Sequence, residues 1–386
     1  MRFSSILLGV LSVAAIAASP VEAAISTSAE HALLMEATSG QVLWAKDGFT
    51  AMPPASMSKL MTLELLFQRL KDGRVKLSDT LPVSERAWRE RGGSEMFVNI
   101  GDRISVENLI RGIIIQSGND ACIVVAEALG GTVEGFVGMM NTRARQIGLK
   151  QSHFVNPDGL PQPDGQLMSA MDLAVLARHL ILDYPKYYRY FGERSFVWSN
   201  IRQDNRNLIL DKFPGADGLK TGHTDAAGYG VTASAVKDGQ RLILVLNGLR
   251  YQNSNDWFAE RYRADEAARI LELAFREFRR YQIFKANEIV GEAKVWGGSA
   301  KTVPLMTAKA LSITLQVESR PGLHVALSYD GPLRAPIAQG QRVGSLVVTA
   351  PDFPALSVPI YAAQDVSRAG IFGRMMMGLR ALWTKD

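Results

Sequence analysis

Pro54-Ala55-Ser56-Met57-Ser58-Lys59 opens a helical run that reaches about Leu70 in this chain of 386 residues. The run is apolar almost all round, and a helix with so little polar surface is usually central and buried. Residues three apart on a helix share a face, so the Ser56 hydroxyl and the Lys59 amine can meet at its first turn. The stretch therefore predicts an interior helix with a reactive pair at its start.

A second S-x-x-K sequence, Ser234-Ala235-Val236-Lys237, lies in an alternating segment that runs into a turn. A motif this short recurs by chance, and positions three apart on a strand point to opposite faces. A helix N-terminus, in contrast, offers free N–H groups and a partial positive charge that favour an alkoxide and an oxyanion. Only the copy at Ser56 fits a nucleophile.

A serine hydroxyl needs a base to be nucleophilic at neutral pH, and no Ser–His–Asp signature occurs. Lys59 is the candidate base, and it can serve only if its pKa falls far enough for the amine to be neutral. Burial beneath the apolar helix and a second nearby cation would both lower that pKa. Lys220 could be the second cation.

Two further motifs follow in order. Ser117-Gly118-Asn119 marks a loop between helices, where the hydroxyl could relay a proton to a leaving amine and the amide could orient Lys59. Alone, this tripeptide would be interpreted as a helix C-cap and turn. Lys220-Thr221-Gly222-His223-Thr224 precedes strand sequence, and Gly222 would let a substrate backbone approach closely. Such an edge can pair with an extended peptide, and Lys220 and Thr221 suit a terminal carboxylate.

The surrounding sequence predicts an α+β fold, an antiparallel sheet with a helical insertion, over residues 24–283. A hairpin at 33–46 precedes the insertion, and strands at 230–236 and 241–246 follow it, joined by an Asp-Gly turn. Short alternating runs separated by Gly and Pro then predict a small β-sandwich domain over 284–362. Helices are expected at 56–70, 105–117, 120–129, 133–148, 170–182 and 263–279.

The two ends of the chain carry targeting signals. Residues 1–23 have a short positive region, an apolar core and small residues at Val21-Glu22-Ala23, which predicts a signal peptide. Within 363–386, apolar residues from Ile371 onward fall on one helical arc flanked by cations, which predicts an amphipathic helix lying in a membrane surface. A terminal helix packed on the protein is the alternative. The chain is thus expected at the periplasmic face of the cytoplasmic membrane, as a peripheral protein.

Composition excludes several other classes. The formal net charge of +5 is mild and the basic residues are scattered, so no nucleic-acid partner is expected. The histidines have no metal-ligand spacing, so no metal site is expected. Cys122, the only cysteine, lies in an apolar stretch and is expected to be a small core residue.

Together these segments resemble the low-molecular-mass penicillin-binding proteins, the D-alanyl-D-alanine carboxypeptidases. Residues 54–59, 117–121 and 217–224 occur in that family's order, and His153-Phe154 and Asp158-Gly159-Leu160 are similar to its loop beside the site. The small β domain and the C-terminal helix also match. The resemblance therefore spans nearly the whole mature chain.

The resemblance implies that Ser56 attacks the carbonyl between two D-alanines of a peptidoglycan peptide while Lys59 takes its proton. Ser117 and Asn119 would complete the proton network. The oxyanion hole would consist of the backbone N–H groups of Ser56 and His223. Water would then release the acyl-enzyme without a cofactor, and β-lactam antibiotics would act as covalent inhibitors.

The resemblance also implies a substrate-binding side of the site. Lys220 and Thr221 would engage the substrate alongside Gly222, and Arg263 is similar to the family's carboxylate-binding arginine. Residues 251–262 depart from the family's usual length and composition.

Two alternatives remain open. A class A-like β-lactamase needs a glutamate that activates the deacylating water. No glutamate lies between Glu134 and Glu193, although Asp158, Asp164 and Asp172 could stand in. The other alternative is a catalytically silent peptidoglycan-binding scaffold, against which the intact set of Ser56, Lys59 and Lys220 argues.

Overall fold

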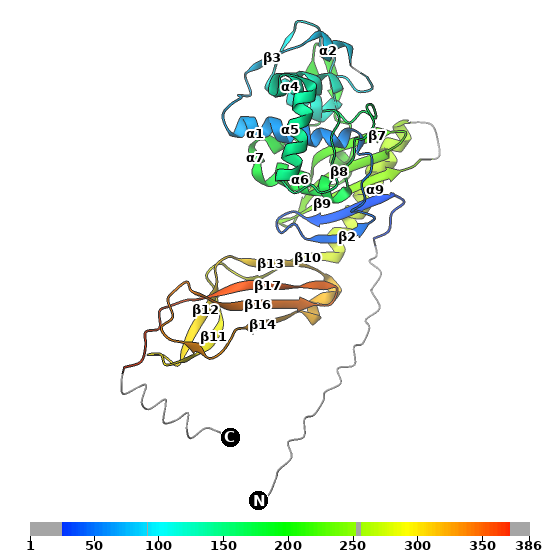
Figure 1. Cartoon of the computed structure of the whole chain (residues 1–386). Coiled ribbons are helices and arrows are strands. Elements are labelled where there is room, and N and C mark those ends of the chain that lie inside the picture. Colours follow the sequence, from blue (N-terminus) through cyan, green and yellow to red (C-terminus); the bar gives the residue numbers. More distant parts are fainter. Residues whose placement is uncertain (1–24, 91, 252–255, 371–386) are drawn as a thin grey trace, which may run out of the picture.

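The computed structural model of the chain describes residues 25–90, 92–251 and 256–370. It has an α+β body followed by a smaller β domain (Figure 1). The body is built on a five-stranded antiparallel sheet in the order β2-β1-β9-β8-β7. The α+β class of the body and the β class of the smaller domain are as the sequence predicts. Its strands are β1 (His31–Glu36), β2 (Val42–Lys46), β7 (Ala216–Thr224), β8 (Gly228–Lys237) and β9 (Gln240–Leu249).

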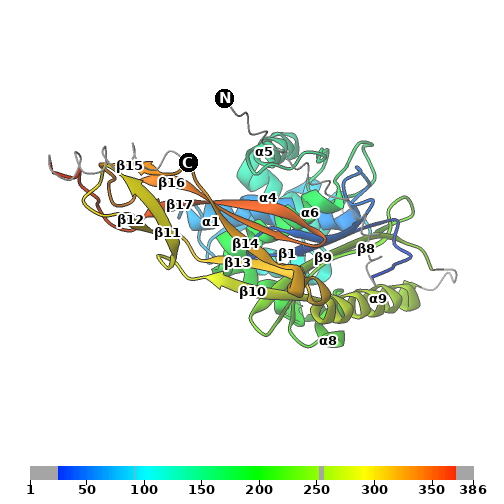
Figure 2. The same cartoon turned by 90° about the horizontal axis from the view of Figure 1, so that it is seen from below.

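Alternation along the strands gives the sheet two apolar faces. Leu33 and Met35 of β1 pack with the helical insertion, whereas Ala32 and Leu34 pack toward the last helix of the body, α9 (Asp256–Glu277). Successive strand residues point to opposite faces, so one strand contributes side chains to the apolar core on each face of the sheet. Figure 2 shows α9 along one side of the sheet, with α1, α4 and α6 on the other.

The insertion between β2 and β7 supplies the helices and two short ribbons, and its central helix is α1 as predicted. Its helical segments and ribbon strands are η1 (Ala55–Ser58), α1 (Lys59–Lys71), β3 (Thr80–Pro82), α2 (Glu85–Arg89), β4 (Arg103–Ser105), α3 (Val106–Arg111), η2 (Gly112–Gln116), α4 (Asn119–Gly130), α5 (Val133–Gln146), α6 (Ala170–Asp183), α7 (Pro185–Tyr188), η3 (Arg189–Gly192), β5 (Ser195–Trp198), β6 (Ile201–Asp204) and α8 (Ile209–Lys212).

Of the helix boundaries that differ from the prediction, three lie close to predicted site residues. The helix expected from Ser56 begins as the 3-10 turn η1, and α-helical geometry starts at Lys59. The helix expected to reach Ser117 ends in the π-turn η2, after which Ser117 is left-handed at φ 64°. The helix expected at 263–279 begins earlier, at Asp256, and ends at Glu277.

The β domain consists of two sheets around an apolar core. A six-stranded sheet in the order β14-β16-β17-β12-β11-β15 packs against the pair β10–β13, with Ile313, Leu346 and Ile360 fully enclosed between them. The alternating runs that predict strands in this domain, at 312–318, 323–329, 342–348 and 356–361, correspond to β13, β14, β16 and β17. The elements are β10 (Phe278–Phe284), β11 (Ile289–Trp296), β12 (Thr302–Thr307), β13 (Leu311–Gln316), η4 (Val317–Gly322), β14 (His324–Ser328), β15 (Leu333–Arg334), β16 (Arg342–Ala350) and β17 (Phe353–Ala362).

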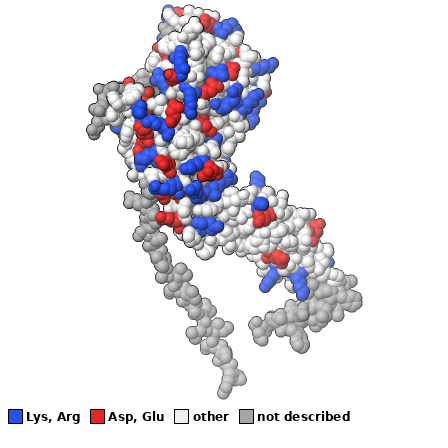
Figure 3. All heavy atoms as spheres, turned by 180° about the vertical axis from the view of Figure 1, so that it is seen from behind, with Lys and Arg blue, Asp and Glu red and all other residues white. Residues whose placement is uncertain are grey.

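The predicted signal peptide (1–23) and residues 371–386 of the predicted C-terminal helix (363–386) lie outside the described residues. The described start of that segment, residues 363–370, is not helical, because Val366 and Arg368 form β-bridges with Ile337 and Gly298. Within the described part of the chain, no single helix is long and apolar enough to cross a membrane, although α4 and α5 reach that length together with an 83° bend between them. On the face drawn in Figure 3, acidic and basic side chains are interspersed.

Candidate active site

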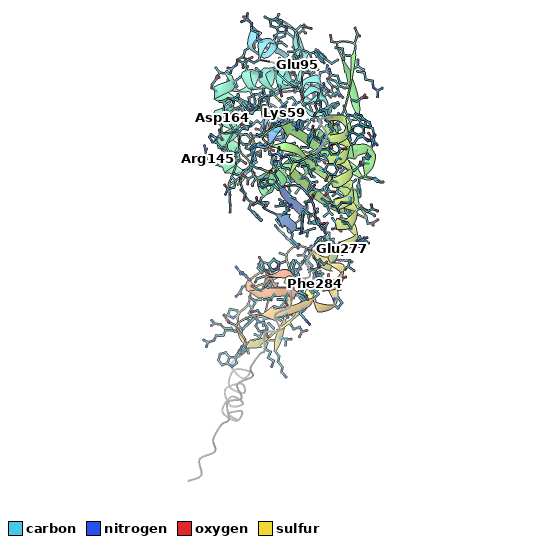
Figure 4. The ribbon with its side chains drawn as sticks, turned by 90° about the vertical axis from the view of Figure 1, so that its right-hand side faces the viewer. Lys59, Glu95, Arg145, Asp164, Glu277 and Phe284 are labelled. Carbon is cyan, nitrogen blue, oxygen red and sulfur yellow. The ribbon has the colours of Figure 1, made fainter. Side chains whose placement is uncertain are left out.

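The centre of the site is the contact between Ser56 and Lys59. Lys59 Nζ lies 2.8 Å from Ser56 Oγ and 2.6 Å from Asn119 Oδ1, and it also donates to the backbone carbonyl of Asp158. The lysine has no exposed surface, and in Figure 4 it lies inside the α+β body. The predicted pair at the start of the buried helix therefore meets.

The partners of Lys59 define how its amine is oriented. The carbonyl oxygens of Asn119 and Asp158 can only accept hydrogen bonds, so they take two N–H groups. The Asn119 amide nitrogen donates to the Gly92 carbonyl, which turns its oxygen toward Lys59. A neutral amine then directs its lone pair at the Ser56 hydroxyl, which can donate. This geometry suits a base.

Burial lowers the pKa of Lys59, since the ammonium form loses its solvation. The positive charge of Arg206 lowers the Lys59 pKa further, while Cys122, Asp158 and Asp120 oppose the shift. Arg206 is thus a cation near Lys59 that the sequence did not predict. The predicted neighbour Lys220 is also coupled to Lys59, because the charge of Lys59 lowers the Lys220 pKa and repulsion between two cations is mutual. The prediction missed Arg206 because it lies in a loop without any periodic pattern.

Ser117 brings a second hydroxyl to the site. It closes the π-turn η2, and its Oγ is buried without a hydrogen-bond partner among the described residues. An unpaired buried hydroxyl is costly to maintain, so this one is available to a bound substrate. Two residues later, Asn119 begins α4, and its backbone N–H donates to the Ser94 carbonyl at 2.8 Å.

The segment over the site is held by Asp120. This buried carboxylate accepts hydrogen bonds from the backbone N–H groups of Met96 and Val98 at 2.9–3.1 Å. Carboxylates that accept several backbone donors fix a loop firmly. The Ser117-Gly118-Asn119-Asp120 sequence thus supplies two side chains of the site and anchors a third element beside it.

Strand β7 forms the opposite wall, at the edge of the sheet. A side chain at Gly222 would meet the Pro54 carbonyl oxygen at 3.0 Å and the Ser56 nitrogen at 3.1 Å, so only glycine lets β7 approach η1 this closely. Lys220 is buried in β7, and its Nζ donates to the Thr221 carbonyl at 3.0 Å. Burial and then the charge of Lys59 bring the pKa of Lys220 well below its ordinary value.

A pocket of about 320 Å³ opens in front of Ser56. Six of the nine predicted site residues line it, while the other three, Lys59, Asn119 and Lys220, are buried. The structure therefore brings all nine predicted residues together. The pocket is lined by Ser56, Gly93, Ser94, Ser117, Arg206, Thr221, Gly222, His223, Tyr229, Asp256, Glu260 and Arg263.

Two arginines give the pocket a cationic side. Arg263 of α9 is 3% exposed, burial lowers its pKa to about 10, and its guanidinium donates to the Arg206 carbonyl at 3.2 Å. The Arg206 guanidinium itself has no hydrogen-bond partner within the described residues. Carboxylates bind guanidinium groups through charge-assisted pairs, so this side can hold an anion.

The three aspartates considered as stand-ins for a β-lactamase glutamate do not line this pocket. The Asp158 carboxylate accepts a hydrogen bond from the backbone N–H of Leu160, and the Asp172 carboxylate accepts from the backbone N–H groups of Lys150 and Gln151. Asp164 is exposed at the edge of the body (Figure 4). The carboxylates that do line the pocket, Asp256 and Glu260, come from the extension of α9.

Cys122 lies in the apolar core of the body. The thiol is buried, and burial raises its pKa to about 12, as expected for a core residue. Among the described residues, no group of three or more His, Cys, Asp or Glu side chains is arranged to hold a metal ion.

Comparison with known proteins identifies two families along the chain. Residues 16–250 match the family model described as D-alanyl-D-alanine carboxypeptidase, Peptidase S11, and residues 278–368 match the C-terminal domain of penicillin-binding protein 5. The chain is 36% identical over 350 residues to the D-alanyl-D-alanine carboxypeptidase DacD of Escherichia coli K12, covering 89% of this chain and 88% of that protein.

Solved structures agree with both domains. Penicillin-binding protein 5 from Haemophilus influenzae superimposes with a TM-score of 0.78 at 32% identity, covering 89% of this chain and 99% of that chain. Penicillin-binding protein D2 from Listeria monocytogenes in its ampicillin-bound form gives 0.55 at 25% identity, over 65% of this chain and 98% of that chain. The chain belongs to the D-alanyl-D-alanine carboxypeptidase family of penicillin-binding serine peptidases.

Proposed function

We propose that Ser56 is the nucleophile of this carboxypeptidase and that neutral Lys59 is its general base. The observation that carries the proposal is the 2.8 Å contact between Lys59 Nζ and Ser56 Oγ, made by an amine without solvent exposure. The amine takes the hydroxyl proton as the oxygen attacks the carbonyl between the two terminal D-alanines. The new C–O bond gives a tetrahedral intermediate.

Stabilisation of that intermediate is assigned to the backbone N–H groups of Ser56 and His223. The close approach of β7 to η1 at Gly222 supports this pairing, because it brings the β7 backbone next to the Ser56 nitrogen. Donors aimed at a developing oxyanion are usually a large contribution to catalysis.

Departure of the terminal D-alanine needs a proton and a binding site for its carboxylate. Ser117, whose buried hydroxyl is unpaired among the described residues, relays the proton from Lys59 to the leaving amine as the C–N bond breaks. Thr221, Arg263 and Arg206 bind the carboxylate, with Lys220 behind them. Water then attacks the Ser56 ester, which releases the shortened peptide and regenerates the hydroxyl.

The substrate class is peptidoglycan peptides that end in D-Ala-D-Ala, with β-lactams as covalent inhibitors. The cationic side of the pocket supports this, since both ligand classes carry a carboxylate beyond the bond that is attacked. Edge strand β7 offers backbone groups to an extended peptide, which supports binding by strand addition.

Intact-mass spectrometry after mixing with benzylpenicillin tests the role of Ser56. We expect one added penicilloyl group on the wild-type protein and on Ser234→Ala, and none on Ser56→Ala. Product analysis with a D-Ala-D-Ala peptide should give free D-alanine. An adduct that persists on Ser56→Ala contradicts the assignment, and rapid loss of the wild-type adduct would favour the β-lactamase alternative. An unmodified wild-type protein would favour the silent scaffold.

We further propose that the chain is exported and held at the periplasmic face of the cytoplasmic membrane. The apolar arc flanked by cations within 371–386 supports an amphipathic anchor, and the leader pattern in 1–23 supports export. Deletion of residues 371–386 is expected to release the mature protein into the soluble fraction. Membrane association that survives the deletion contradicts the anchor.

A further inference from the structure

The end of β7 that carries His223 has few cross-strand side-chain pairs. Strand β7 lies at the edge of the sheet, so β8 is its one strand neighbour there. Gly222 pairs with Gly230, and Thr224 pairs with Gly228, so the positions on either side of His223 have no cross-strand side-chain pair. Cross-strand pairs are the unit of side-chain stabilisation in a sheet. Here that stabilisation depends on the intervening pair, His223 and Tyr229.

These two rings are stacked. Their centroids lie 3.8 Å apart, with 11° between the ring planes. The Tyr229 hydroxyl in turn donates to Asp256 Oδ1 at 2.5 Å, and the Arg263 guanidinium lies 6.0 Å from the centre of the Tyr229 ring. Asp256 is the first residue of α9, so the contacts run from the N-terminus of that helix to the backbone of β7.

The extension of α9 is what makes this contact possible. Residues 256–262 are helical, so α9 begins at Asp256 and not at the predicted Arg263. Figure 2 shows that end of α9 beside β8. A carboxylate at a helix N-terminus is favoured by the free N–H groups and the helix dipole, which suits Asp256 to its place.

We propose that Tyr229 and Asp256 are positioning residues for acylation: Asp256 holds the Tyr229 ring, and the ring fixes the His223 end of β7, where the oxyanion donor lies. The inference rests on the proposed function of Ser56 and of the His223 N–H. Neither residue touches the reacting atoms in this role. They act by keeping a backbone donor aligned at a strand end where the neighbouring positions have no cross-strand side-chain pair.

Four variants test the contact: Tyr229→Leu, Tyr229→Phe, Asp256→Ala and the double variant Tyr229→Phe/Asp256→Ala. The readouts are the maximal acylation rate and the dissociation constant of the noncovalent complex with a fluorescent penicillin. Because oxyanion alignment affects the transition state, Tyr229→Leu should lower the maximal rate by roughly tenfold with little change in the dissociation constant. Phenylalanine keeps the stack, so Tyr229→Phe should lower the rate only about threefold.

The double variant separates coupled from independent roles. If both residues act through one hydrogen bond, Tyr229→Phe/Asp256→Ala should be no slower than either single variant. Tyr190→Phe is the matched control, because it removes another tyrosine–carboxylate bond, from Tyr190 to Glu107 at 2.7 Å, away from the pocket. It should acylate at the wild-type rate.

Several outcomes overturn the inference. A folded Tyr229→Leu protein that acylates at the wild-type rate does so, as does a loss confined to the dissociation constant. If the rate reductions of Tyr229→Phe and Asp256→Ala multiply in the double variant, the two residues act independently, which overturns their action through one hydrogen bond. Should Tyr229→Leu fail to fold, the Phe and Ala variants still decide. A wild-type protein that forms no adduct overturns the function of Ser56 and this inference together, whereas a reactive wild type with unaffected variants overturns positioning alone.

Discussion

The chain contains the same four-residue pattern twice, with very different surroundings. Ser56 and Lys59 span the 3-10 turn η1 and the start of α1, and their heads meet at 2.8 Å in the interior. Ser234 and Lys237 lie on β8, where Ser234 is buried and Lys237 is exposed at the strand end. The comparison shows that S-x-x-K acquires chemistry from backbone geometry, because only a helical turn brings positions three apart onto one face.

The partners of the two serines differ as well. Ser56 faces a buried amine, whereas Ser234 Oγ accepts a hydrogen bond from Arg241 at 2.7 Å. Arg241 is occupied by a two-point ion pair with Asp217 at 2.7–2.8 Å, which ties β9 to β7. An always-charged guanidinium cannot accept a proton, so Ser234 has a structural partner and no base.

The largest expected contrast comes from removing each lysine amine. Lys59→Gln should lower the acylation rate by roughly 10³-fold, because the general base is lost. Lys237→Gln should leave that rate unchanged. The measurement is the time course of labelling by a fluorescent penicillin, with circular dichroism to confirm folding. Equal effects of the two substitutions would contradict the distinction between the copies.

A smaller effect is expected from Asn119, which Lys59 contacts and Lys237 does not. Asn119→Asp places a negative charge beside the amine, which raises the pKa of Lys59 and keeps it protonated. Acylation at neutral pH should fall by about 100-fold and should recover partly as the pH rises. Asn287→Asp, at an exposed position between β10 and β11 of the β domain, is the control. A pH-independent loss would indicate a purely structural role for Asn119.

Substitution of Arg206 is expected to shift the pH dependence of acylation by a more moderate amount. Its positive charge lowers the pKa of Lys59, so Arg206→Gln should let that pKa rise. The rising limb of the acylation rate against pH should therefore move to higher pH. Arg202→Gln, an exposed arginine paired with Asp204, is the matched control. A limb that stays in place or moves to lower pH would show that Arg206 does not act on Lys59.

The smallest expected effect concerns stability. In the interval between the lowered pKa of folded Lys59 and its ordinary value of 10.5, the unfolded chain binds a proton that the folded chain does not. Stability therefore rises with pH in that interval, and below it the slope disappears. Lys59→Met should reduce the slope by up to about 1.4 kcal/mol per pH unit in urea unfolding, while Ser234→Ala should keep it. An unchanged slope in Lys59→Met would argue against a depressed pKa.

The parts of this structure that the sequence predicts are those set by local spacing. The Ser56–Lys59 contact follows from an i,i+3 relation, and the β8–β9 turn follows from Asp238-Gly239, both of which have positive φ. Strand β11 escaped prediction because its inward positions include Gly291 and Ala293, which give little apolar alternation.

Nonlocal contacts account for what the sequence did not predict in the site. Arg206 is positioned by backbone bonding of its loop, with its N–H on the Ile115 carbonyl and the Asn205 amide on the Glu193 carbonyl. Such contacts join distant parts of the chain and leave no periodic signal. The same holds for Asp256, which becomes a site residue only because α9 extends toward β8.

The central claim is that Lys59 carries an uncharged amine at neutral pH. Carbon-13 NMR of protein labelled at the lysine Cε atoms follows the protonation of each amine, and the signal absent from Lys59→Gln identifies this residue. The signal should titrate well below the ordinary lysine value of about 10.4. A Lys59 signal that titrates at or above that value would contradict the account.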